Sequence, residues 1–595
     1  MQHSAKRIAE NASLKAFVNS YIKETSSGEL LPVSKNGQSR HRTKLQTEQM
    51  LEINLPHQRV SLRMEILYRS FVGRHSFGTI LKGDDETGWD QEEPLSVLIL
   101  LIQELHLQAV HSGESKRSCF DECLVRMLES YHSMCTYLEE RLATGEDVLD
   151  PNQTFIDAEQ SLLFGHWLHP TPKSRQGMAY WQHAAYAPEL KGRFQLYYFY
   201  VHHTIMQYES ILDKSVWDIV YEETDVQRID EKWFPFPMHP LQAHYLLEQP
   251  HIRKAIQTGL IQDKGPCGKW YTATSSIRTV FNEESNWMFK FSIPVKVTNS
   301  LRVNKQHELR AGLIIGKVLQ KARWKSKTCR FIHDPAYLAV RLPGVKESGF
   351  ETIVRSNPFQ NGGRGVTTIA ALVQDPLPGS DSKLATIIKE LALKERSSYR
   401  MISEKWFRAY VERAIFPLIS LYDELGIALE AHQQNSLLDI HNGYPTMYYY
   451  RDNQGYYLAE SYRQSLLSLV PELQKTEGLF YDDEVIQNRF TYYLIMNQAF
   501  AVIHRFGADG LMCERQLLKV LKEALKQCCQ RCSGAGRLFI EGLLVKTELA
   551  FKANLLTRFH DVDELAEELE QAVYVKVQNP FQAVTSLEVQ HAETI

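Results

Sequence analysis

The stretch WMFKFSIPVKVTNSLRVN, residues 287–304, has the alternation of a β-strand. Counting by two from Trp287, hydrophobic side chains occupy one face as far as Val297. The opposite face carries Met288, Lys290, Ser292, Lys296 and Thr298. The pattern predicts a strand that buries one face and presents cations and hydroxyls on the other, and Pro294 predicts an edge position or a bulge.

Groups that bind anions gather around this strand. They are Ser275, Ser276, Arg278, Thr279, Lys290 and Arg302. Arginine binds phosphate or carboxylate through paired hydrogen bonds and lysine acts as a point charge, so the set favours an anionic ligand. The alternative is a solvated strand face with incidental charges.

Strand-like pieces broken by Pro and Gly continue on both sides of this stretch. Helical periodicity dominates residues 1–150 and returns in the last third of the chain, apart from a β-rich patch at 425–460. We therefore expect an α+β fold in three parts, 1–150, 151–390 and 391–595. The polar segment Ser34–Lys44 is expected to be a loop.

A second polar cluster, EAHQQN at residues 430–435, precedes the hairpin signal Asn442-Gly443. A two-residue turn there places Asp452 opposite Gln433 and returns a carboxylate to the cluster. In an extended segment, one face would carry Glu430, His432 and Gln434.

Two carboxylates and an amide suit Mg²⁺, which prefers oxygen ligands, and His432 is then a donor to developing negative charge. The alternative is a polar edge hairpin with a satisfied histidine. Zinc is disfavoured because no second histidine stands at a ligand spacing.

Three other stretches carry weaker signals. GHWLHPTPKSRQG, residues 165–177, offers Lys173 and Arg175 to an anion, unless it is a capped surface turn. HPLQAHYLL at 239–247 is typical of a helix start. KANLLTRF could deliver Lys552 or Arg558 to a site, although amphipathic packing is the alternative.

The composition and net charge exclude some classes of protein. The chain of 595 residues is 44% hydrophobic and carries a net charge of −4, which argues against nucleic acid as the main partner. Its start reads as an amphipathic helix without a signal-peptide pattern, and the longest apolar run, Val97 to Ile102, is far shorter than a membrane span. We expect a cytoplasmic protein that does not enter a membrane.

Taken together, these motifs resemble the siderophore synthetases that work without a nonribosomal peptide synthetase, the IucA/IucC or aerobactin synthetase family. The matching elements, in order over residues 155–560, are GHxxHPTPKSRxG, HPLQ, TSSxRT, KFSxPVKVTNSxR, LEAHQQN, RDNQG and KANLLTRF. Within the family the chain is most similar to the citrate-using branch that joins citrate to spermidine in petrobactin assembly.

The resemblance implies a hand-like architecture: a helical thumb (1–150), fingers with a mixed β-sheet (151–390) and a palm built on a β-hairpin (391–595). It implies a ligase that uses ATP and Mg²⁺ to adenylate a citrate carboxylate, releases pyrophosphate and then forms an amide with an amine. It also implies a homodimer.

The resemblance further implies roles for residues. Contacts to ATP are implied for His169, Ser276, Arg278, Thr279, Lys290, Gln434 and Asn435. Contacts to citrate are implied for Thr298, Arg302 and His432, and metal binding for Glu430 and Asp452. We expect the catalytic set to be Arg278, Lys290, Arg302 and His432.

Two alternatives remain open. A kinase-like phosphotransferase would use a similar metal site and would produce ADP. A non-catalytic iron or siderophore-binding protein is suggested by 22 histidines and by a C-terminal resemblance to ferric reductases.

Overall fold

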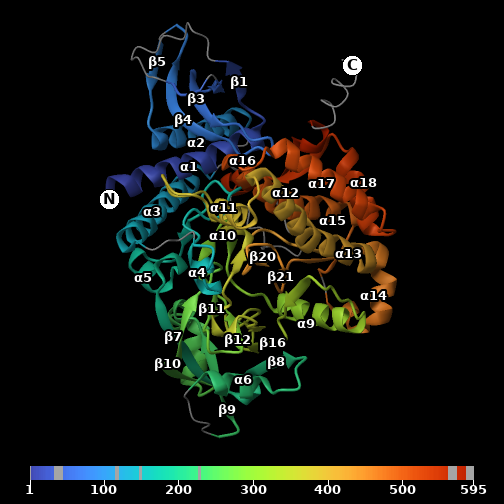
Figure 1. Ribbon diagram of the computed structural model, residues 1–595. Coiled ribbons are helices and arrows are strands. Elements are labelled where there is room, and N and C mark those ends of the chain that lie inside the picture. Colours follow the sequence, from blue (N-terminus) through green and yellow to red (C-terminus); the bar gives the residue numbers. More distant parts are fainter. Residues whose placement is uncertain are drawn as a thin grey trace.

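The computed structural model describes residues 2–32, 45–47, 49–86, 88–113, 119–145, 150–224, 230–476, 478–560 and 573–583. Helices and mainly antiparallel sheets form separate layers, which confirms the α+β class. The N-terminal module lies at one end and the largest sheet at the other, with C-terminal helices along one side (Figure 1). The predicted loop Ser34–Lys44 lies outside the described residues.

The N-terminal module combines helices with a sheet. Its helices are α1 (Gln2–Thr25), α2 (Pro94–His111) and α3 (Phe120–Thr144). Its antiparallel meander contains β1 (Glu29–Pro32), β2 (Gln49–Leu55), β3 (Val60–Tyr68), β4 (Ser76–Asp84) and β5 (Gly88–Gln91). The expectation of a helical region 1–150 is therefore wrong for these strands.

These strands were not predicted because they carry residues that also favour helices, such as Glu65 in β3. Glu65 can be buried in the strand because its carboxylate accepts hydrogen bonds from the backbone of Thr47 at 2.9 Å and Thr79 at 3.2 Å. One helix, α2, is long and apolar enough to cross a membrane, and 39% of it is buried. Its buried residues pack into one core with α1 and the meander.

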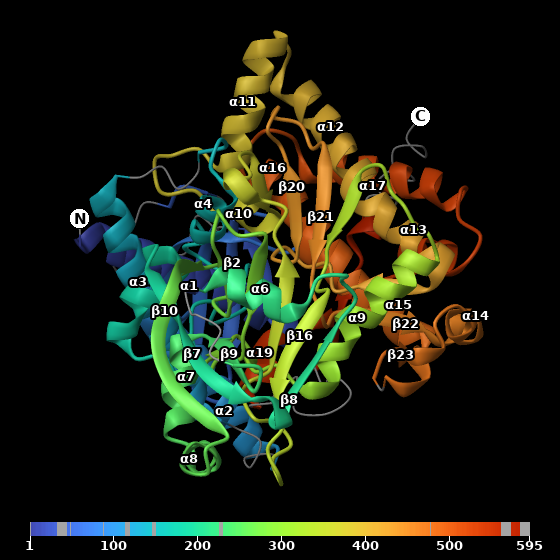
Figure 2. The same ribbon diagram turned by 90° about the horizontal axis from the view of Figure 1, so that it is seen from below.

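The central sheet has eight antiparallel strands in the order β8-β16-β17-β12-β11-β10-β7-β9 (Figure 2). Their bounds are β7 (Arg193–His202), β8 (Met206–Ser210), β9 (Trp233–Met238), β10 (Ile261–Ala273), β11 (Thr279–Phe281), β12 (Trp287–Lys290), β16 (Ala336–Val340) and β17 (Thr352–Ser356). The helices of this region are α4 (Phe155–Gln160), α5 (His183–Tyr186), α6 (Val216–Glu223), α7 (Pro240–Leu247), α8 (Pro250–Gln257) and α9 (Gln306–Lys321).

The strand predicted for residues 287–297 is shorter and more deeply buried than expected. It ends as β12 at Lys290, between β11 and β17, and both of its faces are covered. Pro294 lies in the connection to a small hairpin. That hairpin consists of β13 (Lys296–Val297) and β14 (Ser300–Leu301), with β13 paired to β6 (Arg175–Gln176). The alternative of a solvated strand face is therefore wrong, whereas Lys290 lines a cavity.

The C-terminal region holds the largest core and, besides the two-stranded pair β24-β25 described below, two larger sheets. One sheet has the order β15 (Cys329–Ile332), β21 (Met447–Arg451), β20 (Ser436–Asp439), β18 (Val366–Thr368); the other has the order β19 (Ile427–Leu429), β22 (Tyr456–Ala459), β23 (Phe480–Tyr481). Because β15 and β18 come from the predicted middle part, that part and the last share a sheet.

Helices cover these sheets. They are α10 (Ile369–Val373), α11 (Lys383–Glu395), α12 (Tyr399–Tyr410), α13 (Phe416–Leu425), α14 (Arg463–Leu469), α15 (Asp483–Phe490), α16 (Phe500–Ala508), α17 (Glu514–Cys529) and α18 (Ala535–Val545), with π-helical turns at Val411–Ile415 and Thr491–Ala499. Helix α19 (Asn554–Phe559) lies between the paired strands β24 (Glu548–Lys552) and β25 (Tyr574–Gln578) in sequence.

The predicted hairpin is present, but residues 440–446 connect its strands rather than the two-residue turn expected at Asn442-Gly443, and its register is displaced by one residue. Ser436 pairs with Tyr450, so Asp452 lies level with Gln434 rather than Gln433. Residues 430–435 are not extended, since Gln433–Asn435 form a turn ahead of β20. The expectation that three alternate side chains share a strand face is therefore wrong.

Candidate active site

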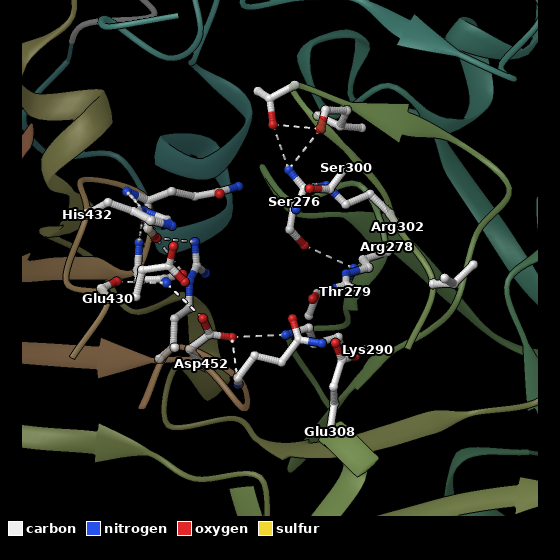
Figure 3. A pocket seen from close by; sticks show the side chains of 18 of the residues that line it. Ser276, Arg278, Thr279, Lys290, Ser300, Arg302, Glu308, Glu430, His432 and Asp452 are labelled. Atoms are coloured by element: carbon white, nitrogen blue, oxygen red, sulfur yellow. Dashed lines mark hydrogen bonds and ion pairs between the residues drawn. The ribbon is translucent and has the colours of Figure 1, made fainter. Parts of the chain in front are cut away.

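A cavity of about 940 Å³ lies between the central sheet and the C-terminal region. Every residue to which the sequence assigned a role lines it: His169, Ser276, Arg278, Thr279, Lys290, Thr298, Arg302, Glu430, His432, Gln434, Asn435 and Asp452. The side chains labelled in Figure 3 fall into two groups that face each other across the hollow.

One wall is cationic. Lys290, at the end of β12, places Nζ 3.1 Å from Oδ1 of Asp452. Arg278, just before β11, donates from Nη1 to Oδ1 of Asn304 at 2.9 Å. Burial, with Arg302 nearby, lowers the pKa of Arg278 to about 10. This wall gathers three cationic side chains, Arg278, Lys290 and Arg302, at one cavity, so it favours an anionic ligand.

The TSSxRT turn holds the edge of this wall. Oγ of Ser276 accepts a hydrogen bond from the backbone N–H of Thr279 at 3.1 Å. The intervening Ile277 has φ +66, which is unusual for a β-branched residue. Oγ1 of Thr279 is buried and has no hydrogen-bond partner among the described residues. The turn thus directs an unsatisfied hydroxyl to the cavity, as a ligand site would.

Thr298 and Arg302 lie beside each other on the β13–β14 hairpin. Nη2 of Arg302 donates to Oγ1 of Thr298 at 3.0 Å and to the carbonyl of Val297 at 3.1 Å. Next in the chain, Asn299 interacts through Oδ1 with Nε2 of His169 at 3.0 Å. The hairpin therefore connects the two sequence motifs GHxxHPTPKSRxG and KFSxPVKVTNSxR.

His432 lies on the opposite wall, in the turn before β20. Its Nδ1 accepts backbone N–H groups from Gln434 at 3.2 Å and Asn435 at 3.4 Å. The ring proton therefore resides on Nε2. Burial lowers the pKa of His432 to about 4, because the charged ring would lose its hydration. At neutral pH His432 is thus a neutral donor.

The carboxylates of Glu430 and Asp452 lie close together on this wall, because both approach Gly455. A Cβ atom added to Gly455 would lie 2.8 Å from Oε2 of Glu430 and 3.1 Å from Oδ2 of Asp452. Asn435 donates from Nδ2 to the same Oδ2 at 3.0 Å. Burial alone would raise the pKa of Asp452, but Lys290 and Arg355 hold it below its usual range.

Mg²⁺ suits this donor set. The two carboxylates provide hard oxygen ligands beside an amide, and Mg²⁺ takes one or two carboxylates while water and phosphate complete its shell. Among the described residues no group of three or more His, Cys, Asp or Glu forms a closed metal cage. The geometry thus fits a metal that shares its ligands with a substrate.

The GHWLHPTPKSRQG segment is buried rather than a surface turn. Lys173 and Arg175 line the cavity, with their nitrogens 2.5 and 2.6 Å from Oε1 of Glu189. Two cations therefore share one carboxylate. His169 lines the cavity, and burial lowers its pKa to about 4.

His239 caps α7 as expected, accepting the N–H of Leu241, and does not line the cavity. Lys552 does line it, and its Nζ donates to the hydroxyl of Tyr493 at 3.1 Å. Arg558 is buried on helix α19, as the alternative of amphipathic packing predicted.

Several residues of the site were missed from the sequence. Glu159 bridges the two walls, because it accepts hydrogen bonds from Arg451 at 2.8 Å and from Oγ of Ser275 at 2.7 Å. Asn497, on a π-helical turn, binds the backbone N–H of Gln433 at 3.0 Å and so fixes the His432 turn. A lone glutamate or asparagine within a helical pattern gives no sequence signal for such a bridge.

Comparison with known proteins gives two family matches. Residues 154–374 match the model described as IucA / IucC family, and residues 404–567 match the model described as Ferric iron reductase FhuF-like transporter. Together they cover the segments that build both walls of the cavity.

Individual relatives agree with the first match. The chain is 40% identical to the spermidine-citrate ligase of Bacillus anthracis over 98% of both chains. It is 30% identical to the rhizobactin siderophore biosynthesis protein RhbC of Rhizobium meliloti over 87% of this chain and 90% of the relative.

Among solved structures, ATP-bound aerobactin synthetase IucA of Klebsiella pneumoniae aligns with a TM-score of 0.84 at 24% identity, covering 96% of this chain and 99% of that one. Petrobactin biosynthesis protein AsbB of Bacillus anthracis aligns with a TM-score of 0.73 at 17% identity, covering 99% and 97%. At these identities the structural matches establish the shared fold.

Proposed function

The chain belongs to the IucA/IucC family, and from that premise we propose that it is an ATP-dependent ligase of siderophore biosynthesis. A citrate carboxylate oxygen attacks the α-phosphorus of ATP, and the bond to pyrophosphate breaks. An amine nitrogen then attacks the citryl carbonyl carbon, the bond to AMP breaks, and the nitrogen loses a proton as the amide forms.

One observation carries this proposal: the cationic side chains Arg278, Lys290 and Arg302 face Glu430, His432 and Asp452 across a single cavity (Figure 3). Citrate and ATP are both polyanions, and their approach is opposed by charge repulsion. Cationic side chains gathered on one wall of the cavity offset that repulsion.

The residues divide between the two reacting groups. Arg278 and Lys290, with Ser276 and Thr279, suit the ATP phosphates, and His169, Gln434 and Asn435 adjoin the nucleotide. Thr298 and Arg302 suit a citrate carboxylate. The neutral Nε2–H of His432 is a donor for charge that develops on the carboxyl group.

Glu430 and Asp452 would hold Mg²⁺, which screens phosphate charge when bound. Asn435 supports this arrangement by fixing Oδ2 of Asp452. The role of the protein is to hold the two carboxylates close together, and Lys290 favours the charged form of Asp452.

Spermidine is the favoured amine. Two carboxylates, Glu308 and Glu347, line the cavity, and neither makes an ion pair with any residue that the structure describes. Each accepts a backbone N–H, from Lys305 at 2.8 Å and from Gln306 at 3.1 Å, and their negative charge suits a cation that binds beside them. A polyamine provides such a cation, and the spermidine-citrate ligase relative supports the same choice.

A pyrophosphate-release assay tests the proposal. Purified protein is given Mg-ATP and citrate with spermidine, hydroxylated cadaverine, hydroxylated lysine, diaminopropionate or ethanolamine. We expect citrate-dependent release of pyrophosphate and AMP, fastest with spermidine. Arg302→Ala should remove the citrate dependence and leave the protein folded, and wild-type release by that variant would show that citrate binds elsewhere.

The same assay separates the alternatives. A kinase-like phosphotransferase would form ADP instead of AMP and pyrophosphate. An iron or siderophore-binding protein would bind its ligand with no nucleotide turnover.

We also propose that the enzyme acts in the cytoplasm, where ATP and citrate are available, and as a homodimer, which sedimentation would test.

A further inference from the structure

The turn that carries Thr298 has an unusual backbone. Val297 pairs with Ser300, so Thr298 and Asn299 are the two turn residues of the β13–β14 hairpin. Thr298 has φ +54. Two-residue hairpin turns place Gly, Asn or Asp at positive φ, and a β-branched residue there is strained. Such a conformation persists when its surroundings hold it in place.

Arg558 contacts this turn from outside the cavity. Its Nη2 donates to the carbonyl oxygen of Thr298, and the side chain is 1% exposed. Arg558 does not itself line the cavity. On the cavity side, Arg302 donates to Oγ1 of the same threonine at 3.0 Å. One arginine thus restrains the backbone of Thr298 while the other contacts its hydroxyl.

The position of Arg558 is fixed by the N-terminal module. Leu555 and Phe559, on the same helix α19, are buried in the core that α1, α2 and the meander form. The carboxylate of Glu24, on α1, accepts the backbone N–H groups of Leu555 at 3.0 Å and Leu556 at 2.8 Å. Helix α19 is therefore anchored in one module while Arg558 reaches the hairpin of another.

We propose that Arg558 is a positioning residue, which keeps Thr298 in the left-handed conformation that presents its hydroxyl to Arg302. The inference rests on the proposed function, in which this pair binds citrate. It gives the N-terminal module a role in the reaction, because the module determines the geometry of the citrate-binding hairpin through Glu24 and α19.

Steady-state kinetics of pyrophosphate release tests the inference. Arg558→Gln should raise the KM for citrate roughly tenfold, since a hydrogen bond from a charged donor is lost, and leave the KM for ATP within about twofold. Arg558→Lys keeps a charged donor and should recover part of the loss. Arg537→Gln is the matched control, because Arg537 is exposed and pairs with Glu541 on α18.

A double-mutant cycle distinguishes positioning from general destabilisation. Thr298→Gly raises the citrate KM by removing the hydroxyl, yet glycine adopts positive φ without strain. In that background Arg558→Gln should have less than about a twofold further effect, because the two changes act on one contact. Additive effects, or equal changes in the KM for citrate and ATP, would overturn the inference.

Crystal structures of Arg558→Gln and Arg558→Lys give a readout independent of activity. Loss of the positive φ at Thr298 is the expected result in Arg558→Gln, with a smaller displacement of the turn in Arg558→Lys. An unchanged turn in Arg558→Gln contradicts the proposal, as does an unchanged turn in Arg558→Lys if only that variant folds. A wild-type enzyme without citrate-dependent turnover would instead contradict the proposed function, and the φ of Thr298 would still decide the role of Arg558.

Discussion

Lys290 and Asp452 form an ion pair of 3.1 Å between the central sheet and the end of the C-terminal hairpin. Both groups are almost fully buried. Both side chains line the cavity, and an anion that binds beside Lys290 would compete with Asp452 for the same ammonium group. The pair thus connects the cationic wall to the wall that carries Asp452.

The first prediction concerns the pH dependence of ATP binding. Burial lowers the pKa of Lys290 to about 8; Asp452 opposes this shift and Arg278 contributes to it. The ammonium form is present below that pH and is lost as pH rises through it, so the KM for ATP should rise above about pH 8. Lys290→Arg keeps its charge and should flatten the profile; equal slopes in both enzymes would contradict this role of Lys290.

The second prediction concerns His432. Because its pKa is lowered to about 4, the ring stays neutral and should contribute no titration to kcat between about pH 5.5 and 7.5. Removing its N–H by His432→Ala should reduce kcat by about 10²-fold, as for other donors to developing negative charge. A retained kcat with a raised KM would mean that His432 binds citrate without assisting the chemical step.

The third prediction concerns the metal site. A Cβ at Gly455 would lie 2.3 Å from Cβ of Glu430, so Gly455→Ala must displace that side chain. We expect a Mg²⁺ requirement raised roughly tenfold or more, as for Glu430→Gln and Asp452→Asn, because each disturbs an oxygen ligand.

Gly542→Ala is the matched control for the third prediction. An added Cβ there meets nothing closer than 3.8 Å, so this change should leave the Mg²⁺ titration of pyrophosphate release unchanged. If Gly455→Ala titrates like wild type, the two carboxylates have a structural role.

The residues that line the cavity were easier to predict from the sequence than the bounds of the strands. Short motifs such as TSSxRT and LEAHQQN carry their polar side chains in the local sequence, so Arg278 and His432 could be named as candidates before they were known to line one cavity. Bridging residues such as Glu159 and Asn497 act through tertiary contacts, and their local sequence gives no sign of a partner.

The fold was harder to predict where local pattern and tertiary environment disagree. The alternation at 287–297 predicted one buried face and one face that presents cations and hydroxyls, yet neighbouring layers bury both faces of β12. The charge of Lys290 is accommodated by Asp452, 162 positions along the chain. The meander strand β3 carries Leu, Met and Glu, whose helix preference is overridden by strand pairing and burial.

The last prediction concerns the amine. Burial, with Glu351 and Glu308 nearby, raises the pKa of Glu347, so its negative charge is lost on acidification sooner than that of an ordinary glutamate. Glu347→Gln should raise the KM for spermidine by about five- to tenfold and leave the citrate KM unchanged, since one charge-assisted contact to a cation is removed. Glu523→Gln on the exposed face of α17 is the control.

The spermidine KM of the wild type should also rise as pH falls, while that of Glu347→Gln should depend less on pH. The ratio of the two KM values should therefore shrink on acidification, because protonation of Glu347 removes the same charge as the substitution does. A ratio that stays constant with pH, or an equal effect on ethanolamine, which lacks a second ammonium group, would exclude Glu347 as the partner of a polyamine nitrogen.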